Sequence, residues 1–474
     1  MNKSLGCLLS RTIRRRGWGA FGLFLSLCLV GSFSNCSHAE PSGAIGGESL
    51  QLRAVLELPY RDYFMSIDAK SVITECSQAL KDNRHHTDMI LARILKRRGE
   101  AYAAESNFKE AKADFDKAID LQPSDCESKW ERCIACARLG DDKGAKKELD
   151  NLVRDFPKYA PPYVTLAHLL LAQGDYDAGI RLASKAIALD PRLGEAYYIR
   201  SQAYFATSDY QKCLTDMNHF IELMPFKGEY FPEHPYLIRG KALLILEKHE
   251  DAIFNFQMAR RLNASSFEPL FWLWRANVNV GRTHVSYMMS LEMLKTHGDN
   301  PLAYTAQATS LNLCGRPKQA LTSAQKGLTL EADSPELHAQ LGAAYDQLGK
   351  YEDALKEFDI ALRNNPDHIS ALCGKAYVYA TCPDDTLRNG KRAQELAKKC
   401  CDLTDNKNVI MLGLLSEAQA ENDQMKEAIR TVKECLDKCG KNEDMKGRLE
   451  KLLAVFENGR PYRREYDPKP INDE

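Results

Sequence analysis

The sequence predicts an all-α fold, a solenoid of tandem helical hairpins, and two observations support this fold class. The segments 96–123 and 339–366 carry small, aromatic, alanine and proline residues at the same seven offsets. Within each segment, apolar residues are three and four positions apart, which is the stripe of an amphipathic helix. One hairpin cannot bury its apolar face alone, so neighbouring hairpins must stack. The matched pairs are Gly99 and Gly342, Tyr102 and Tyr345, Phe108 and Tyr351, Ala111 and Ala354, Phe115 and Phe358, Ala118 and Ala361, and Pro123 and Pro366.

Length and composition agree with a repeat array. The chain has 474 residues, of which 44% are hydrophobic and 27% charged. Its 28 Gly and 19 Pro residues are about a tenth of the chain, near the ordinary share of roughly 12%, which excludes collagen-like and Pro/Gly-rich disordered chains. The length exceeds the roughly 250–300 residues at which one hydrophobic core stops growing. The chain must therefore fold as several domains or as a repeat array.

The charge balance gives no sign of a nucleic-acid partner. The chain has 64 basic and 65 acidic residues, but residues 1–39 hold five of the basic ones and no acidic residue. The remainder has 59 basic and 65 acidic residues, a net charge of −6. Proteins that bind nucleic acid usually carry a basic face, so we expect none here.

Residues 1–39 are predicted to be a signal peptide. Three arginines at 14–16 precede the apolar run 20–33, and Ser37-His38-Ala39 then gives small residues around a cleavage site. This order predicts export across an inner membrane, to the periplasm or beyond. The alternative is a membrane anchor formed by residues 20–33, but its 14 residues are fewer than the roughly 20 that a membrane span requires.

The repeat register predicts ten units over residues 92–442. Unit starts are 34 residues apart, except that a five-residue insertion in PFKGEYFPEHP delays one start and the unit from residue 369 is stretched to 40 residues. Each unit is expected to consist of a first and a second helix. Prolines such as Pro123 end the second helix, because proline lacks the N–H that a helix interior requires. Glycines such as Gly349 mark the turn inside a unit. The unit from 267 is degenerate. The predicted starts are residues 92, 126, 160, 194, 233, 267, 301, 335, 369 and 409.

The segments outside the array are predicted to be caps and linkers. Residues 40–65 are a linker or N-terminal segment, and residues 66–91 form a capping helix or half repeat. Residues 443–457 are predicted to form a final helix that covers the last unit. Residues 458–474, with three prolines, are predicted to be a flexible tail.

The 34-residue pattern of glycine, tyrosine, alanine and proline resembles the tetratricopeptide repeat, a helix–turn–helix unit. The resemblance implies a right-handed α-α superhelix whose first helices form a concave surface that binds partners. A narrower resemblance covers residues 380–404, which contain ATCPD and ELAKK, and the ending VFENGRPYRRE at 455–465. Both are similar to segments of exported or envelope-associated bacterial tetratricopeptide proteins, although Asn389 stands where aspartate is usual. This second resemblance implies a bacterial origin but no particular chemistry.

The resemblance also implies which side chains form the partner-binding groove. Groove positions are the second, fifth, ninth and twelfth of each unit, and in the central units they are mostly apolar and aromatic. The alternative is that some of these side chains only pack between neighbouring first helices. The candidate residues are Val164, His168, Leu171, Tyr198, Gln202, Phe205, Leu237, Lys241, Leu244, Phe271 and Arg275.

A clamp for a C-terminal carboxylate, which some relatives have, is disfavoured. Lys96 could match the clamp lysine, but Glu100 stands where asparagine is expected, and Glu127 and Glu131 add negative charge. We therefore expect the ligand to be an extended or helical apolar segment of a protein or peptide.

Two sets of cysteines require an interpretation. Cys133 and Cys136 have the spacing of a redox pair, but they fall at packing positions, where buried cysteine behaves as a small hydrophobic residue. Cys400 and Cys435 share one offset in successive second helices, and could form a disulfide after export. We favour a packing role for both sets.

Two tryptophans in FWLW also have two interpretations. Trp274 is predicted to be core. Trp272, two positions away, is predicted to point elsewhere and is the better surface candidate.

No motif in the sequence predicts catalysis. A phosphate-binding loop, an HExxH helix and a GxSxG elbow are all absent. We therefore expect no enzymatic activity, no cofactor and no metal site.

The function we expect is a non-catalytic adaptor in the bacterial cell envelope that binds a peptide or protein segment in its groove. One alternative is a structural accessory subunit of an envelope enzyme or secretion complex that binds through its outer face. Another is a thiol-dependent module. Membrane contact is expected only through the N-terminal segment, and the oligomeric state is left open.

Overall fold

The computed structural model describes residues 69–81, 87–223, 233–404, 408–440 and 443–464. These residues form 22 helices and no strand, so the all-α fold class is confirmed. The predicted signal peptide and the predicted linker lie outside the described residues. None of the described helices is long and apolar enough to cross a membrane.

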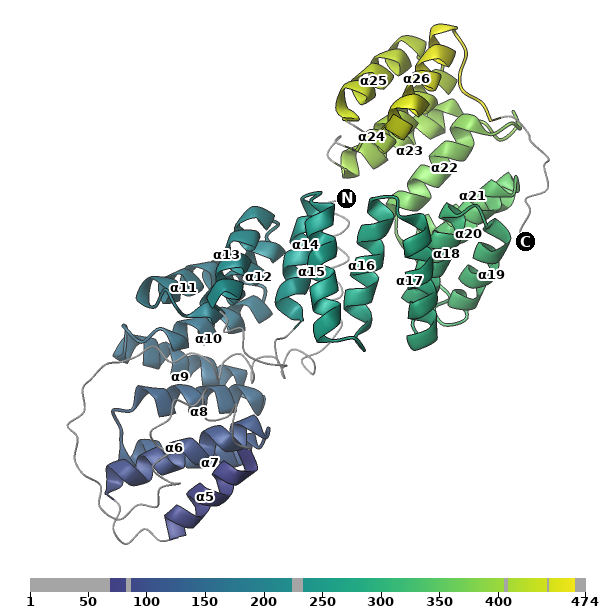
Figure 1. Ribbon diagram of the computed structural model, residues 1–474. Coiled ribbons are helices and arrows are strands. Elements are labelled where there is room, and N and C mark those ends of the chain that lie inside the picture. The colour runs from purple at the N-terminus through teal and green to yellow at the C-terminus, as the bar shows by residue number, and fades with distance from the viewer. Residues whose placement is uncertain (1–68, 82–86, 224–232, 405–407, 441–442, 465–474) are drawn as a thin grey trace. The chain divides into compact units, whose positions relative to one another are not determined.

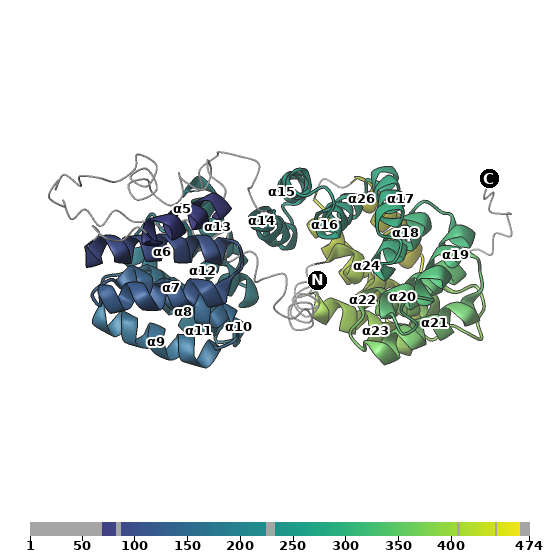
Figure 2. The same ribbon diagram turned by 90° about the horizontal axis from the view of Figure 1, so that it is seen from below.

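The chain divides into two compact units, and the division falls after residue 242, within α14. In the N-terminal unit, consecutive helices from α5 to α13 pack side by side in chain order (Figures 1 and 2). Its helices are α5 (Ala69–Lys81), α6 (Asp88–Ala104), α7 (Phe108–Leu121), α8 (Cys126–Arg138), α9 (Asp142–Asp155), α10 (Pro161–Ala172), α11 (Tyr176–Leu189), α12 (Gly194–Ala206), α13 (Tyr210–Leu223) and most of α14 (His234–Ile245).

The C-terminal unit continues the same alternation of first and second helices. Its first helices α16, α18, α20, α22 and α24 contact one another in succession, and we call the surface that they form the first-helix face. The helices are α15 (His249–Leu262), α16 (Phe267–Asn279), α17 (Thr283–Thr296), α18 (Pro301–Leu313), α19 (Pro317–Leu328), α20 (Pro335–Gln347), α21 (Tyr351–Asn364), α22 (Ile369–Thr381), α23 (Gly390–Leu403), α24 (Val409–Glu421), α25 (Met425–Lys438) and α26 (Glu443–Glu457).

Small residues let the two helices of a hairpin approach. A Cβ atom added to Gly342 would lie 2.6 Å from the ring of Phe358, and one added to Gly99 would lie 2.7 Å from the ring of Phe115. These distances are too short for two carbon atoms that are not bonded. Phe115 and Phe358 therefore each require glycine at the facing position of the first helix. The paired positions that the sequence pattern repeats are therefore a packing contact.

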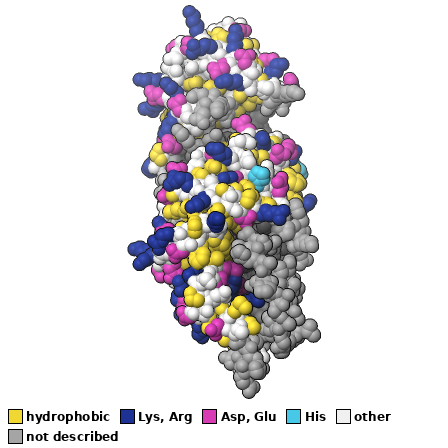
Figure 3. Space-filling model, turned by 90° about the vertical axis from the view of Figure 1, so that its left-hand side faces the viewer, with side chains coloured by type: hydrophobic (Ala, Val, Ile, Leu, Met, Phe, Trp, Pro, Cys, Tyr) yellow, Lys and Arg dark blue, Asp and Glu magenta, His cyan; other side chains and the backbone are white. Residues whose placement is uncertain are grey.

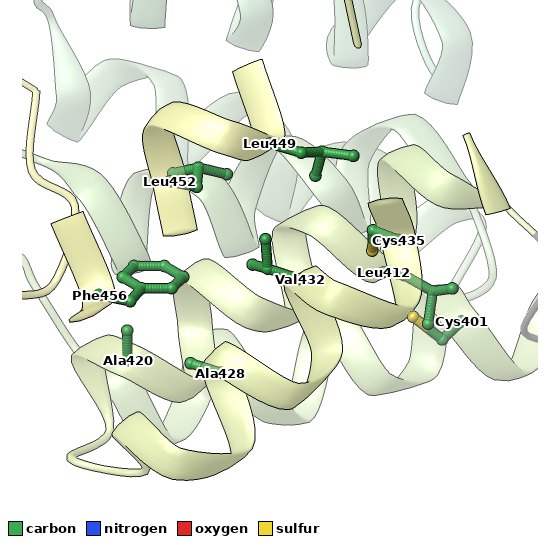
Figure 4. Close-up of a cluster of buried hydrophobic side chains, with 9 residues drawn as sticks. All are labelled: Cys401, Leu412, Ala420, Ala428, Val432, Cys435, Leu449, Leu452 and Phe456. Carbon is green, nitrogen blue, oxygen red and sulfur yellow. The ribbon is translucent and has the colours of Figure 1, made fainter. Parts of the chain in front are cut away.

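The last hairpin is closed by α26. Leu449, Leu452 and Phe456 of α26 are buried against α24 and α25, in the cluster that Figure 4 draws. The residues after α26 correct one prediction. Residues 458–464 are not a flexible tail. The backbone of residues 458–460 is bonded to the end of α26, and Arg463 and Arg464 are bound to the first-helix face, as described below, while residues 465–474 lie outside the described residues.

The prediction for Trp272 was wrong, whereas Trp274 is core as predicted. Trp272 is only 8% exposed, and its ring stacks at 6.2 Å from the ring of Phe256 in α15. Trp274 is also buried and donates a hydrogen bond from Nε1 to the Ser310 hydroxyl, at 2.9 Å. A first helix in a solenoid packs on two sides, so a residue two positions from the core stripe can be buried as well.

Candidate functional site

The C-terminal segment, residues 459–464, lies against the ends of three first helices. The backbone N–H of Arg464 donates to the carbonyl oxygen of Thr381, the last residue of α22, at 3.0 Å. The Arg464 guanidinium donates two hydrogen bonds of 2.9 Å to the carboxylate of Asp346, near the end of α20. Arg463 donates two of 3.2 Å to Glu421, the last residue of α24. Cations are favoured at helix C-termini because the helix dipole is negative there.

Two tyrosine rings enclose the Arg464 side chain. Its guanidinium carbon lies 4.6 Å from the ring centre of Tyr377 and 5.0 Å from that of Tyr351. Burial lowers the pKa of Arg464, but the pairing with Asp346 outweighs burial, and the net pKa is raised. A charged guanidinium is thus held by a carboxylate and two aromatic faces, which is a strong and directional arrangement.

The two segments of the narrower resemblance meet at this place. Arg388, which follows ATCPD, donates to the carbonyl oxygens of Cys382 and Pro383 at 2.8 and 2.9 Å, and to Glu421 at 3.1 Å. Glu421 therefore receives Arg388 from the loop after α22 and Arg463 from the C-terminal segment. The resemblance to envelope proteins stays a prediction, but these two stretches form one structural unit.

A cavity of about 520 Å³ lies beside this segment, between α22, α24, α26 and Tyr462. Glu417 of α24 has a side chain with no exposed surface, and its Oε1 accepts a 3.2 Å hydrogen bond from Arg448. Its Oε2 has no partner among the described residues. Burial raises the pKa of Glu417, and Arg448 opposes that shift. The side chains that line the cavity include Tyr377, Glu417, Arg448, Lys451, Leu452 and Tyr462.

Sequence reasoning missed the residues of this site, although a usable signal existed. Asp346 is the twelfth residue of the unit from 335, and Tyr377 and Glu417 are the ninth residues of the units from 369 and 409. These are groove positions by the same resemblance, but the prediction applied it only to the central units.

The predicted groove residues separate into two groups by burial. Four of them are core, and Tyr198, for example, is 5% exposed with its ring 5.0 Å from the ring of Phe220. The side chains of this group are packed in the interior of the array. The buried four are Val164, Tyr198, Leu237 and Leu244. The half-buried seven are His168, Leu171, Gln202, Phe205, Lys241, Phe271 and Arg275.

Two half-buried basic side chains of this set have shifted pKa values. Burial, together with the nearby Arg138, lowers the pKa of His168 to about 4, so the imidazole is neutral at pH 7. Burial also lowers the pKa of Arg275, which Glu336 opposes, and Nε of Arg275 has no partner among the described residues.

The four cysteines singled out in the sequence, Cys133, Cys136, Cys400 and Cys435, are buried and form no disulfide. Cys133 and Cys136 lie in the core, and burial raises the pKa of both thiols, which disfavours a reactive thiolate. Cys400 and Cys435 are both free, and the sulfur near Cys400 is that of Cys373, at 3.2 Å. Among the described residues, no group of three or more His, Cys, Asp and Glu side chains could hold a metal ion.

One face of the molecule carries described side chains of both charges. On the face that Figure 3 draws, basic and acidic side chains of the described residues are interspersed, and hydrophobic side chains gather in the middle part. A partner of this face would therefore meet apolar groups between charges of both signs.

Family models of the tetratricopeptide repeat match residues 92–125, 164–212 and 335–368. The similar curated proteins are eukaryotic. Anaphase-promoting complex subunit 3 of Schizosaccharomyces pombe is 22% identical over 60% of this chain and 42% of its own length. Tetratricopeptide repeat protein 16 of Mus musculus is 21% identical over 44% of this chain and 29% of its own length. The chain thus spans less than half the length of these two relatives. DnaJ homolog subfamily C member 3 of Mus musculus is 20% identical over 63% of this chain and 64% of its own length.

Two solved structures of low identity align with most of the chain. Yeast Tom70 aligns with 82% of this chain and 96% of its own, at 13% identity and a TM-score of 0.42. The Cut9 and Hcn1 hetero-tetramer of APC/C aligns with 81% of each chain, at 14% identity and a TM-score of 0.42.

The matched family models and the observed stacking of helical hairpins agree on one family. Arrays of this kind present extended surfaces to protein partners, so the chain is an interaction scaffold. It is a tetratricopeptide-repeat protein.

Proposed function

We propose that this protein is a non-catalytic adaptor of a bacterial cell envelope that holds an extended segment of a partner protein on the first-helix face of its C-terminal unit. The observation that supports this most is that the same face already binds a non-helical segment of the chain, through Arg463 and Arg464. Extended peptides are recognised by main-chain hydrogen bonds and by pockets for their side chains. Here the carbonyl oxygen of Thr381 accepts a main-chain hydrogen bond, and the carboxylate of Asp346 binds a side chain.

The partner segment lies beside the chain's own segment and does not replace it. Tyr462 forms one wall of the 520 Å³ cavity, while α24 and α26 contribute Glu417 and Leu452. A cavity of this volume accepts one or two side chains. The bound C-terminal segment therefore completes the groove, and the partner occupies the space that remains.

Photo-crosslinking in the native cells tests this proposal. A photoreactive amino acid replaces Lys451, which lines the cavity, and in a second strain it replaces Lys356, an exposed residue of α21. We expect position 451 to crosslink one partner through a short segment, identified by mass spectrometry, and position 356 to crosslink none. Crosslinks that are the same from both positions would contradict groove binding.

A second candidate function is a structural subunit that binds through its outer face, and two exposed apolar side chains on second helices favour it. Phe254 of α15 and Met288 of α17 are 56% and 52% exposed. These two second helices are joined by ion pairs, such as Arg282 with Glu250 at 2.8 Å. A third crosslinking position at Met288 separates the candidates, because a partner captured only from this position would favour the outer face.

The envelope location is tested separately. We expect N-terminal sequencing of the protein from its native host to begin at Glu40, since Ser37-His38-Ala39 precedes it. An intact Met1 with retention in the membrane would favour the anchor formed by residues 20–33.

A further inference from the structure

The cavity beside the C-terminal segment has a buried acceptor with unused capacity. Glu417 is fully buried, one of its oxygens accepts a single 3.2 Å hydrogen bond from Arg448, and the other has no partner among the described residues. A buried carboxylate oxygen without a donor is unfavourable, so the site favours a ligand that supplies N–H groups.

A filled site of the same composition lies next to it. Asp346 accepts both hydrogen bonds of the Arg464 guanidinium, which packs on the rings of Tyr351 and Tyr377. In the cavity, Glu417 takes the place of the carboxylate, and Tyr377 and Tyr462 provide the rings. Tyr377 belongs to both sites, so the face presents two neighbouring places with a first-helix carboxylate and two tyrosines.

We propose that this cavity is a pocket for the guanidinium of an arginine in the partner's segment. The inference rests on the proposed function, and it adds the chemistry of the ligand. A planar guanidinium fits between aromatic faces and can satisfy both oxygens of a carboxylate, whereas the ammonium of lysine is a compact point charge.

Arg448 is the internal competitor for this pocket. It holds Glu417 by one hydrogen bond, and its side chain is 54% exposed, so it can move into solvent when another guanidinium binds. Lys451 also lines the cavity and opposes a cation, whereas Glu443 favours one. The charged side chains of the lining therefore balance, with two carboxylates and two basic groups. Among them, Glu417 is the fully buried one, so we expect the ligand to carry the opposite, positive charge.

Peptide titration of the full chain tests the pocket. The probes are acetyl-Gly-Arg-Gly-amide and the same peptide with citrulline, which keeps the shape of arginine but has no charge, and binding is measured by ligand-observed NMR. We expect the arginine peptide to bind at least about tenfold more tightly than the citrulline peptide, since charge-assisted hydrogen bonds are the stronger kind. Equal binding of the two peptides, or tighter binding of acetyl-Gly-Glu-Gly-amide or of the lysine peptide, would overturn the proposal.

Two variants act in opposite directions. Glu417→Gln keeps the shape of the side chain, removes its charge and should weaken arginine binding by about tenfold. Arg448→Ala frees the carboxylate and should strengthen binding severalfold. The control is Glu427→Gln on α25, where the carboxylate pairs with Arg430 outside the cavity, and it should change nothing. Thermal unfolding confirms that each variant is folded.

The outcomes distinguish this inference from the proposed function. Unchanged binding by Glu417→Gln, or weaker binding by Arg448→Ala, would overturn the arginine pocket and indicate an anionic ligand. If position 451 still crosslinks the partner when Glu417 is replaced by Gln, the partner binds in the groove as proposed, but the arginine pocket is contradicted. If the arginine peptide binds in solution but position 451 gives no crosslink in cells, the arginine pocket is supported and the proposed function is contradicted.

Discussion

The N-terminal and C-terminal units both contain arginine–aspartate pairs with two hydrogen bonds, but these pairs have different purposes. In the N-terminal unit, Arg200 donates two hydrogen bonds of 2.8 Å to Asp216, and Arg98 pairs with Asp114 in the same way. Each pair joins residues 16 apart, on the two helices of one hairpin. In the C-terminal unit, Arg464 makes two equal bonds to Asp346, which is 118 residues away.

The sequence separation of the paired residues distinguishes a pair that stabilises a hairpin from a pair at the candidate site. The 16-residue pair recurs three units apart, in α6 with α7 and in α12 with α13, so it belongs to the construction of a hairpin. The pair between Arg464 and Asp346 has no place in the repeat pattern, and it fixes a segment next to a cavity. In a repeat protein, an ion pair that does not follow the period indicates where to look for function.

Breaking a pair inside a hairpin should have the largest effect. Arg200→Met leaves Asp216, which is buried, without its partner, and removing one member of a buried pair costs about 3–5 kcal/mol. We expect a loss of that size in urea unfolding, with faster hydrogen exchange in α12 and α13. Lys212→Met, which removes an exposed pair with Asp209, should leave the urea unfolding midpoint nearly unchanged. A loss no larger than this control would show that the pair is not structural.

A change in pH sharpens the comparison within the N-terminal unit. His168 has a folded pKa of about 4 against 6.5 for the free side chain, so the unfolded state binds more protons between these values. Stability should therefore fall as the pH is lowered from about 6.5 to 4.5, by about 2 kcal/mol from this group. His168→Leu should remove that part of the pH dependence. Urea titrations of both proteins at the two pH values measure it, and parallel losses would indicate an exposed imidazole.

Breaking the long-range pair should cost less and act locally. Asp346→Asn weakens the two bonds from Arg464, so we expect a loss of about 1–2 kcal/mol in the last hairpins. The freed segment should be cleaved by trypsin after Arg463 and Arg464 at least about ten times faster. Asp353→Asn, which affects an exposed pair with Lys356, is the control and should leave cleavage unchanged. A large loss of overall stability would place this pair with the structural ones.

The smallest effect is expected at a turn. Glu247 has a φ of +62°, at the place where five other units have glycine, such as Gly349 at +73°. A left-handed backbone is unfavourable for a residue with a Cβ, so Glu247→Gly should stabilise the C-terminal unit by about 0.5 kcal/mol. Tryptic cleavage of the C-terminal segment should not change. A lower unfolding midpoint would show that the glutamate side chain has a stabilising contact.

The fold could be predicted almost completely from the sequence because its contacts are periodic. First helices begin at Cys126, Gly194, Phe267, Pro301 and Pro335, at the residues where the register starts its units. Periodicity works here because each hairpin packs only on its neighbours, and the same spacing of small and aromatic residues must recur.

The site could be predicted only in part, because its contacts are not periodic. The groove positions implied by the resemblance include Asp346 and Glu417, but the same rule selects Tyr198 and Leu244, which are buried between helices. The position of a residue within its unit predicts on which face of the helix the side chain lies, but not how much of that side chain is exposed. The docking of Arg464 has no counterpart in other units, so neither period nor composition could indicate it.

The pair between Arg464 and Asp346 also sets an order of events during synthesis. The hairpins of the array can form one after another as the chain leaves the ribosome, since each requires only its neighbours. Asp346 must wait for Arg464, which is 118 residues later, or roughly 6–24 s at ordinary rates of translation. The groove is therefore completed last, and a chain that ends early can have a well-folded array without a finished binding surface.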